Sequence, residues 1–445
     1  MAASFDLLLR NGTVVNHDGK AVRDIAVIGD HIAGIGSFRE ASAGRSIDCS
    51  GLHVLPGVID TQVHFREPGA THKEDLASGG RAAVMGGVTG VFEMPNTVPP
   101  TVGVTSLADK VERAVDRMPC DFAFYVGGTA DNFRELGGLE RLPGCCGVKV
   151  FMGSSTGNLL IEDDAGLSRI LSAITRRAAF HSEDEARLRS RADVRVPDDP
   201  SSHQHWRDVE TARLATERLL RLARLAGKRV HVLHVSTAEE LPLLAANRDL
   251  ASCEVTPHHL TLVAPEAYRR LGTKAQMNPP LRDGAHQESL WQAVRAGLFD
   301  VLGSDHAPHT LGEKALPYPQ SPSGMPGVQT LVPVMLDHVS KGRLTIERFV
   351  DMTSHGPARL FQIAAKGRIA LGYDADFTVV DLRARRTITS DWIESRCGWT
   401  PYDGYEVEGW PIGTIVRGKV VMWEGEIAGA AAGRPMRFSD TRSAA

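Results

Sequence analysis

Histidine, aspartate and lysine side chains recur in this 445-residue chain where apolar, β-branched stretches end. Neutral imidazoles together with a carboxylate are the usual ligands of Zn²⁺ in hydrolytic sites, which keep one coordination position open for water. Such a metal lowers the pKa of water from about 16 to about 7 and polarises the carbonyl under attack. In chain order the polar residues are His64, Arg66, Asn96, Lys149, His181, His234, His258, His259, Asp305, His306 and His309. These residue types predict a metal-dependent hydrolytic site.

Eight apolar stretches alternate with helical patterns such as Asp208–Ala226, which is typical of repeated βα units. The predicted strands are Val54–Asp60, Val88–Met94, Asp121–Gly127, Gly147–Met152, Arg177–His181, Arg229–Val235, Cys253–Thr256 and Asp300–Gly303. They favour an α/β fold of the (β/α)₈ TIM-barrel type. A doubly wound open sheet is the alternative, but no G-x-G-x-x-G follows the first strand. In a barrel the carboxyl ends of the strands converge, so these polar residues would share one face.

A single histidine at the end of a strand is more often a structural residue than a metal ligand. Convergence of three such histidines with Asp305 on one barrel face argues against that interpretation for the whole set. His203 and His205 lie in a polar loop, where we expect solvated side chains. For His258 and His259, a place in the pocket and a purely structural role both stay open.

Lys149 interrupts the otherwise apolar stretch Gly147–Met152, where an unpaired ammonium group would be costly. A desolvated lysine shifts toward the neutral amine, which reacts with CO₂ to give a carbamate. The carbamate is a carboxylate ligand that can bridge two metal ions. A lysine paired with Asp305 or another carboxylate is the alternative, and the sequence does not choose between the two.

Both ends of the chain contain short β-branched runs, separated near the N-terminus by Asn-Gly and Gly-Asp turns. We therefore expect one small β-sandwich domain of residues 1–54 and 367–430. It would accompany a barrel domain of residues 55–366 and a C-terminal tail of residues 431–445. Within the barrel domain, Thr310–Met325 is rich in Pro, Gly and Ser and should form a loop over the pocket mouth.

The composition is ordinary for a soluble globular protein, with 42% hydrophobic and 23% charged residues. A net charge of −4 gives no reason to expect nucleic acid or an anionic membrane as partner. The sequence has no run of 18 apolar residues, so we expect no membrane-spanning helix. The N-terminus lacks the pattern of a signal peptide, so we expect a cytoplasmic protein. The six cysteines are scattered without a C-x-x-C pair, which predicts reduced, mostly buried thiols.

In its order of motifs the chain resembles the class I dihydroorotases of the amidohydrolase superfamily over nearly its whole length. The motifs are His64–Gly69, Met94–Thr97, Gly147–Phe151, His181–Glu183, His234–Thr237, Glu254–His259, Met277–Arg282, Ser304–His309 and Gly372–Phe377. The resemblance implies the reversible cyclisation of N-carbamoyl-L-aspartate to L-dihydroorotate in pyrimidine biosynthesis. It also implies a small-molecule substrate and a homo-oligomer. A cyclic amidase of hydantoinase or allantoinase type is an alternative, against which Arg66 and Asn96 argue.

The resemblance also implies a role for each site residue. One or two zinc ions would be held by His64, His181, His234, Asp305 and Lys149, the last as a CO₂-derived carbamate. Asp305 would be the general base that takes a proton from the attacking water and returns it to the leaving nitrogen. The substrate carboxylate would be held by Arg66, Asn96 and His309, because arginine offers a planar fork of donors. The amide edges of the ring would be held by Asn278, Ser323 and Gly324.

Gln62 departs from the family pattern, because the resemblance implies a histidine two residues before His64. An amide oxygen is a much poorer zinc ligand than an imidazole nitrogen. Three outcomes stay open: Gln62 still ligates or holds a ligating water, the buried metal site is weak or empty, or the chain is inactive. An inactive chain would suit a non-catalytic partner of aspartate carbamoyltransferase. We favour an active enzyme with an altered buried site, because the other expected ligands and the carboxylate-binding residues are all in place.

Overall fold

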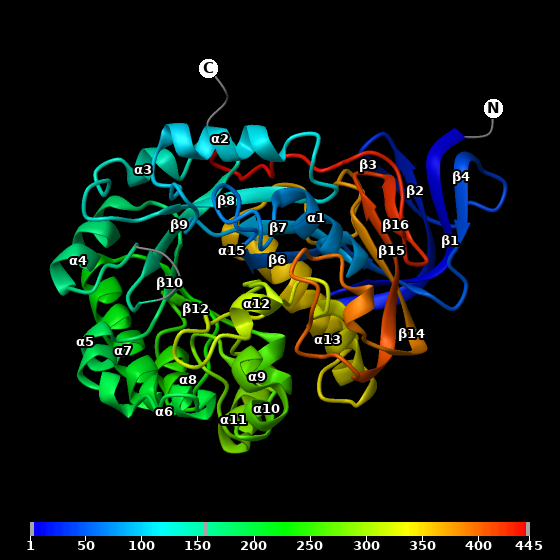
Figure 1. The fold of residues 1–445 in the computed structure, drawn as a ribbon. Coiled ribbons are helices and arrows are strands. Elements are labelled where there is room, and N and C mark those ends of the chain that lie inside the picture. The colour runs from blue at the N-terminus through cyan, green and yellow to red at the C-terminus, as the bar shows by residue number, and fades with distance from the viewer. Residues whose placement is uncertain (1–3, 155–158, 442–445) are drawn as a thin grey trace.

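The computed structural model describes residues 4–154 and 159–441, and its centre is a parallel barrel (Figure 1). The barrel strands are β6 (Val58–Val63), β7 (Val88–Glu93), β8 (Asp121–Gly127), β9 (Cys145–Phe151), β10 (Ala178–His181), β11 (Val230–Val232), β12 (Ala251–Val255) and β13 (Val301–Leu302). They pair in chain order from β6 to β13. A parallel bridge joins Val63 to His306, and the His64 amide donates to the His306 carbonyl at 2.7 Å. The barrel therefore closes, and the predicted (β/α)₈ fold is confirmed.

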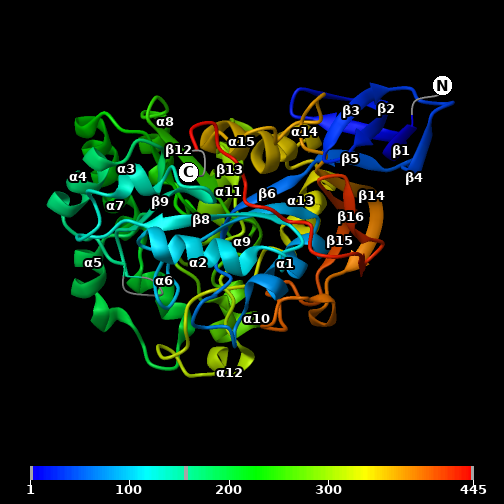
Figure 2. The same cartoon turned by 90° about the horizontal axis from the view of Figure 1, so that it is seen from above.

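Helices surround the barrel (Figure 2). They are α1 (Leu76–Met85), α2 (Val104–Ala114), α3 (Leu136–Leu139), α4 (Asp164–Ala173), α5 (Glu185–Ser190), α6 (His203–Trp206), α7 (Val209–Ala226), α8 (Glu240–Ala245), α9 (Pro257–Thr261), α10 (Glu266–Leu271), α11 (Gly284–Arg295), α12 (Leu311–Lys314), α13 (Leu331–Ser340), α14 (Ile346–Val350) and α15 (Gly356–Phe361). The predicted helix Asp208–Ala226 is α7, with Asp208 as its N-cap, accepting from the amide of Thr211. None of the described helices is long and apolar enough to cross a membrane.

Both ends of the chain build a second, nine-stranded sheet beside the barrel, seen in Figure 1 as blue and red strands side by side. Its strands are β1 (Ser4–Asn16), β2 (Gly19–Ile28), β3 (His31–Gly36), β4 (Ser42–Asp48), β5 (His53–Pro56), β14 (Phe377–Thr387), β15 (Glu406–Val416), β16 (Lys419–Trp423) and β17 (Glu426–Ile427). The N-terminal strand β5 pairs with the C-terminal strand β14, so neither chain end makes this sheet alone.

The first predicted barrel strand, Val54–Asp60, is wrong in its first half. The strand is interrupted at Gly57. Strand β5 before it belongs to the small sheet, and only β6 after it enters the barrel. A side chain at Gly57 would not fit, because its Cβ would lie 2.2 Å from the Thr89 hydroxyl. The apolar pattern continues through this glycine, so periodicity alone gave no sign of the change of sheet.

The C-terminal segment packs across the amino-terminal end of the barrel. The Phe122 amide at the start of β8 donates to the Arg434 carbonyl at 3.1 Å, and the Met436 amide donates back to Phe122 at 2.8 Å. Met436 and Phe438 are buried in a cluster of core residues there. This segment therefore covers the barrel floor, opposite the face where the predicted site lies. The six cysteines are buried and free, as predicted.

Candidate metal centre and active site

The carboxyl ends of the barrel strands bring most of the predicted site residues around one small cavity. Its lining includes Gln62, His64, Arg66, Lys149, His181, His234, Asn278, Asp305, Ser323 and Gly324. The cavity measures about 20 Å³, room for about one water molecule. Asn278 and Ser323 also line a wider neighbouring cavity of about 370 Å³, which His309 and Lys73 border. The two cavities thus share part of their walls. Ser323 and Gly324 come from the predicted loop Thr310–Met325.

Three of these residues hold a backbone conformation that is uncommon outside glycine. Their φ angles are 63° for Arg66, 35° for His234 and 47° for Asp305. Such conformations cost about 1–3 kcal/mol each and persist only where the surrounding structure enforces them. Their coincidence around one cavity marks this face of the barrel as the functional one.

His181 and His234 converge in a way that suits two ligands of one metal ion. Nε2 of His181 lies 2.9 Å from the Glu183 carboxylate, and Nδ1 lies 3.0 Å from Nε2 of His234. Burial alone would raise the pKa of Glu183, but Arg207 and His181 outweigh it and lower that pKa to about 2. The carboxylate therefore fixes the His181 proton on Nε2 and leaves the Nδ1 lone pair facing His234. Two nitrogens bound to one tetrahedral zinc ion would lie about 3.3 Å apart, so the donor set fits.

Lys149 is buried in β9 without a carboxylate partner among the described residues. Its Nζ donates to the Val150 carbonyl at 3.3 Å and lies 4.1 Å from the centre of the Phe151 ring. Burial lowers the pKa of Lys149 well below its usual value. The structure thus lacks the salt bridge that was the alternative for this residue, and the neutral amine is the form that reacts with CO₂.

Asp305 accepts a hydrogen bond from Gln62 and lies beside His64 in the cavity. Nε2 of Gln62 donates to its Oδ1 at 2.9 Å, and Nε2 of His64 lies 3.4 Å from the same oxygen. Nδ1 of His64 in turn lies 2.8 Å from the side-chain carbonyl oxygen of Asn96, which fixes the proton of His64 on Nδ1. Burial raises the pKa of Asp305 to about 7.

Gln62 presents the wrong end of its amide for a metal ligand. The amide nitrogen faces Asp305, while Oε1 is buried without a hydrogen-bond partner in the described chain. The nitrogen that faces the carboxylate has no lone pair for a metal ion, and an amide oxygen is a much poorer zinc ligand than an imidazole nitrogen. The donor set on this wall therefore fits a metal ion less well than the pair His181 and His234.

Arg66 is a buried cation with no carboxylate at salt-bridge distance among the described residues. Burial lowers its pKa to about 10, so it stays charged at neutral pH. Its Nε donates to the Pro308 carbonyl at 3.2 Å, and one terminal nitrogen lies 3.3 Å from His309 Nε2. Lys73 donates to the other His309 nitrogen at 3.1 Å. A buried cation beside the metal-ligand set is a site for an anionic group of a ligand.

The sequence and the fold are similar to those of known proteins. The amidohydrolase family model matches residues 53–186 and 204–421. The chain is 39% identical to a dihydroorotase of Halobacterium salinarum, over 94% of this chain and 97% of that protein. It is 36% identical to an allantoinase of Rubrobacter xylanophilus, over 98% of both. A solved L-hydantoinase from Arthrobacter aurescens superposes with a TM-score of 0.93 at 30% identity, covering 97% of this chain and 99% of that one.

The chain belongs to the amidohydrolase family. Potential metal ligands of this amidohydrolase gather around the small cavity. Its predicted strand-end histidines do not all serve that site. His258 lies 2.9 Å from the Tyr402 hydroxyl, and His259 bonds Thr256 and the Pro279 carbonyl. Neither lines the cavity, so both are structural.

The prediction of a solvated His203 is wrong, whereas His205 is exposed as expected. His203 is buried at the start of α6, with Nε2 at 2.9 Å from the Asn278 side-chain oxygen and 3.2 Å from the Met277 carbonyl. Burial lowers its pKa to about 3, so the ring is neutral. Nε2–H therefore donates to the side-chain oxygen of Asn278. The amide nitrogen of Asn278 then faces away from His203. Sequence reasoning missed this residue because the surrounding loop is polar and has no periodic pattern.

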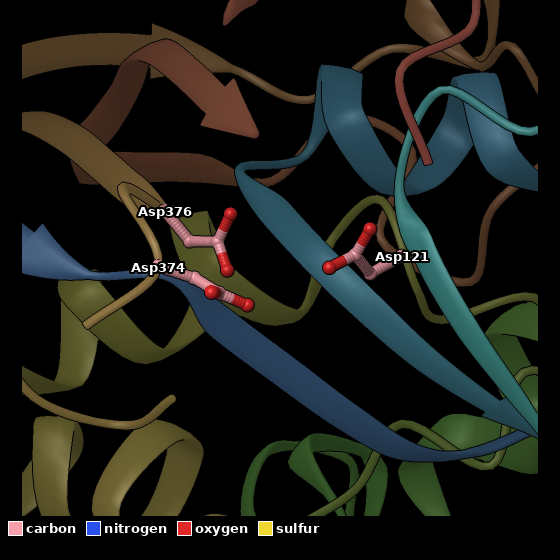
Figure 3. Close-up of side chains that lie close together, drawn as sticks. All are labelled: Asp121, Asp374 and Asp376. Carbon is pink, nitrogen blue, oxygen red and sulfur yellow. The ribbon is translucent and has the colours of Figure 1, made fainter. Parts of the chain in front are cut away.

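A second group of potential ligands in this amidohydrolase, Asp121, Asp374 and Asp376, is not a metal site (Figure 3). The Lys366 ammonium already lies among them, 2.6 Å from Asp121, 3.0 Å from Asp374 and in contact with Asp376. Arg417 adds bonds of 2.9 Å to Asp121 and 3.2 Å to Asp374. The two cations occupy the space a metal would need. The cluster joins the start of β8 to the chain leading into β14.

Proposed function

We propose that this amidohydrolase is a dihydroorotase that interconverts N-carbamoyl-L-aspartate and L-dihydroorotate. The observation that carries this proposal is the buried, uncompensated guanidinium of Arg66 beside the metal-ligand set. Dihydroorotate bears a carboxylate on its ring, whereas hydantoins and allantoin do not. The similarity to dihydroorotases such as that of Halobacterium salinarum supports the same assignment.

We further propose zinc as the metal, with one ion held by His181, His234 and the carbamate of Lys149. Gln62 supports a single ion, because an amide oxygen is a much poorer zinc ligand than an imidazole nitrogen and the amide nitrogen donates to Asp305. When bound, the ion supplies a Lewis acid that polarises the ring amide carbonyl and lowers the pKa of water.

The residues of the chain then divide the remaining work. Arg66 and His309 hold the substrate carboxylate and so fix the ring, while the amide nitrogen of Asn278 and the backbone at Ser323 and Gly324 meet its amide edges. Asp305, held by Gln62, takes a proton from the attacking water and delivers it to the ring nitrogen as that nitrogen leaves. In the direction of ring closure the same groups act in reverse order. Asn96, which the sequence predicts to hold the carboxylate as well, bonds Nδ1 of His64 through its side-chain oxygen and so positions that ring.

Two alternative functions are distinguished from dihydroorotase by particular residues. The likeness to an allantoinase and an L-hydantoinase supports hydrolysis of uncharged rings, but a buried Arg66 would then have no anion to meet. A non-catalytic role beside aspartate carbamoyltransferase is supported by Gln62 alone. The homo-oligomer, the association with that enzyme and the cytoplasmic location stay predictions.

The test of the carboxylate assignment is Arg66→Gln, assayed with dihydroorotate and with dihydrouracil, which lacks the carboxylate. We expect the KM for dihydroorotate to rise about 100-fold, equivalent to about 2.7 kcal/mol of lost binding. The rate with dihydrouracil should change much less, which separates loss of recognition from misfolding. An unchanged KM for dihydroorotate would remove the basis of the proposal.

A further inference from the structure

A cavity of about 660 Å³ with a strongly charged lining lies at the amino-terminal end of the barrel strands, away from the metal-ligand set. It opens beside the residues that precede β10 and β11 and beside the end of α15. Six cationic side chains line it: Arg141, Arg176, Arg177, Lys228, Arg229 and Arg359. Asp440 is the one carboxylate among its described lining residues. Because the whole chain carries a net charge of −4, this concentration of positive charge is local.

The carboxylates near the cavity do not balance these cations. Asp440 accepts from Nε of Arg176 at 2.8 Å and lies 3.8 Å from Arg141, so it is shared between two arginines. Asp300, behind the cavity wall, binds Arg248 at 2.7 Å and lies 3.5 Å from Arg359. Two carboxylates are thus spread over four arginines.

Arg177 and Arg229 are left without any carboxylate at salt-bridge distance in the described chain. Nη1 of Arg177 donates to the Val230 carbonyl at 2.8 Å and to the Ser252 hydroxyl at 3.0 Å. The other guanidinium nitrogens of Arg177 make no hydrogen bond within the described residues. Burial and the positive charges of neighbouring arginines, including Arg229, lower the pKa of Arg177 to about 10. The Val230 carbonyl and the Ser252 hydroxyl therefore fix one edge of this guanidinium, and the other edge is left to face the cavity.

The cavity also has the size and the apolar wall of a small-molecule site. Its volume falls in the usual range of about 300–1,000 Å³ for ligand pockets. Leu360 and Phe361, at the end of α15, also line it. Several arginines around one space suit phosphate groups, which accept two parallel hydrogen bonds from one guanidinium. A carboxylate ligand of one charge would leave most of the cations uncompensated.

We propose that this cavity binds an oligophosphate, either inorganic or as the tail of a nucleotide. It is separate from the active site, since catalytic residues of such barrels lie at the carboxyl ends of the strands. It is nevertheless attached to the same strands. Arg177 precedes β10, which ends at the metal ligand His181, and four residues of strand span about 13 Å. Arg229 likewise precedes β11, beyond which His234 lies.

The experiment is calorimetric titration of the full-length protein with inorganic triphosphate and, separately, with ATP, without divalent metal in the buffer. We expect saturable binding of one molecule per chain, weakened by added salt because the contacts are ionic. Equal affinity for the two probes assigns recognition to the phosphates alone. Tighter binding of ATP adds a contribution of the Leu360 and Phe361 wall. Both results support the proposal.

The deciding variant is Arg229→Glu with Arg359→Glu, because both side chains are exposed and their replacement leaves the core intact. We expect at least tenfold weaker binding. The matched control is Arg383→Glu with Arg385→Glu, which makes the same change of charge on side chains that are 80% and 81% exposed in the small sheet. If the double variant does not fold, as judged by circular dichroism, Arg229→Gln alone replaces it. Absence of binding by the unmodified protein, or equal weakening in variant and control, would overturn the proposal.

Discussion

The side-chain amide of Gln62 donates from Nε2 to Oδ1 of Asp305 at 2.9 Å, where the first and last strands of the barrel meet. This bond has two consequences. It keeps the proposed general base in place without a second metal ion, and it turns the amide nitrogen, which cannot ligate, toward the carboxylate. Compared with the histidine expected at this position, Gln62 removes a metal ligand and supplies a hydrogen-bond donor to Asp305.

Replacing Gln62 by histidine should restore the missing ligand. We expect the unmodified protein to retain about one zinc ion per chain after dialysis, and Gln62→His to retain about two. Elemental analysis of the two proteins, prepared side by side, measures this directly and does not depend on activity.

The control for that experiment is Gln62→Met, which has a similar volume but neither donor nor strong ligand. It should retain the same single ion as the unmodified protein and lose activity, because Asp305 loses its hydrogen-bond donor. Two ions in the unmodified protein would show that the amide of Gln62 does serve as a ligand, which would contradict the proposed single-ion site.

His203 should act on substrate binding through Asn278. His203→Phe removes the bond to the Asn278 oxygen, so the amide is no longer held. We expect the KM for dihydroorotate to rise about tenfold, equivalent to about 1.4 kcal/mol, with a smaller change in kcat. His203→Gln, which keeps a donor, should recover part of the loss. Equal KM values in all three proteins would leave His203 with a packing role only.

Lys314 should make stability depend on pH. It is buried in α12, where Nζ donates to the Pro322 carbonyl at 2.8 Å, and burial lowers its pKa to about 7. The unfolded chain keeps this proton up to the ordinary lysine pKa, so between about 7 and 10 the unfolded state binds more protons. Deprotonation in the folded state therefore makes folding more favourable as the pH rises, by about 1.4 kcal/mol per unit.

Lys314→Met removes this titration, so the two proteins should differ in a pH-dependent way. The free energy of unfolding in urea should favour Lys314→Met most below pH 7, and that advantage should shrink as the pH rises toward 10. A difference between the two proteins that stays constant over this range would mean that Lys314 remains charged in the folded state.

Lys366 should contribute strongly to stability, because its ammonium group lies among three buried carboxylates. Lys366→Met leaves Arg417 to offset these charges and leaves Asp376 without its ion pair, so we expect the free energy of unfolding to fall by about 3–5 kcal/mol. The control is Lys341→Met, which breaks an ion pair with Asp337 at a lysine that is 57% exposed and should cost less than about 1 kcal/mol. Added metal should not rescue Lys366→Met if the cluster is an ion network. Rescue by a divalent cation would make it a metal site after all.

The sequence predicted the barrel well because its strands are apolar runs separated by amphipathic helices. Helix α7 begins and ends where an N-cap aspartate and a left-handed glycine place it, at Asp208 and Gly227. The strand-end positions of His64, His181 and His234 followed from the same pattern, because a barrel brings all carboxyl ends to one face. These signals lie within each element, so they can be recognised without knowledge of its contacts to distant segments.

What the sequence did not predict depends on side-chain direction and on contacts between distant segments. The apolar run through Gly57 hides a change of sheet that only packing against Thr89 reveals. The contact of His203 with Asn278 joins the start of α6 to a loop 75 residues further along the chain. The orientation of the Gln62 amide depends on Asp305, 243 residues away. None of these contacts produces a periodic pattern in the sequence.

The proposed activity is tested most directly by assaying one preparation of the full-length protein with L-dihydroorotate, hydantoin and allantoin, before and after removal of metal by a chelator. We expect a kcat/KM for dihydroorotate that is at least about 100-fold above that for the two uncharged rings, equivalent to about 2.7 kcal/mol of discrimination. We also expect chelation to abolish this activity and zinc with bicarbonate to restore it. A preference for hydantoin or allantoin, or protein that stays inactive with every substrate when zinc and bicarbonate are supplied, would contradict the assignment as a dihydroorotase.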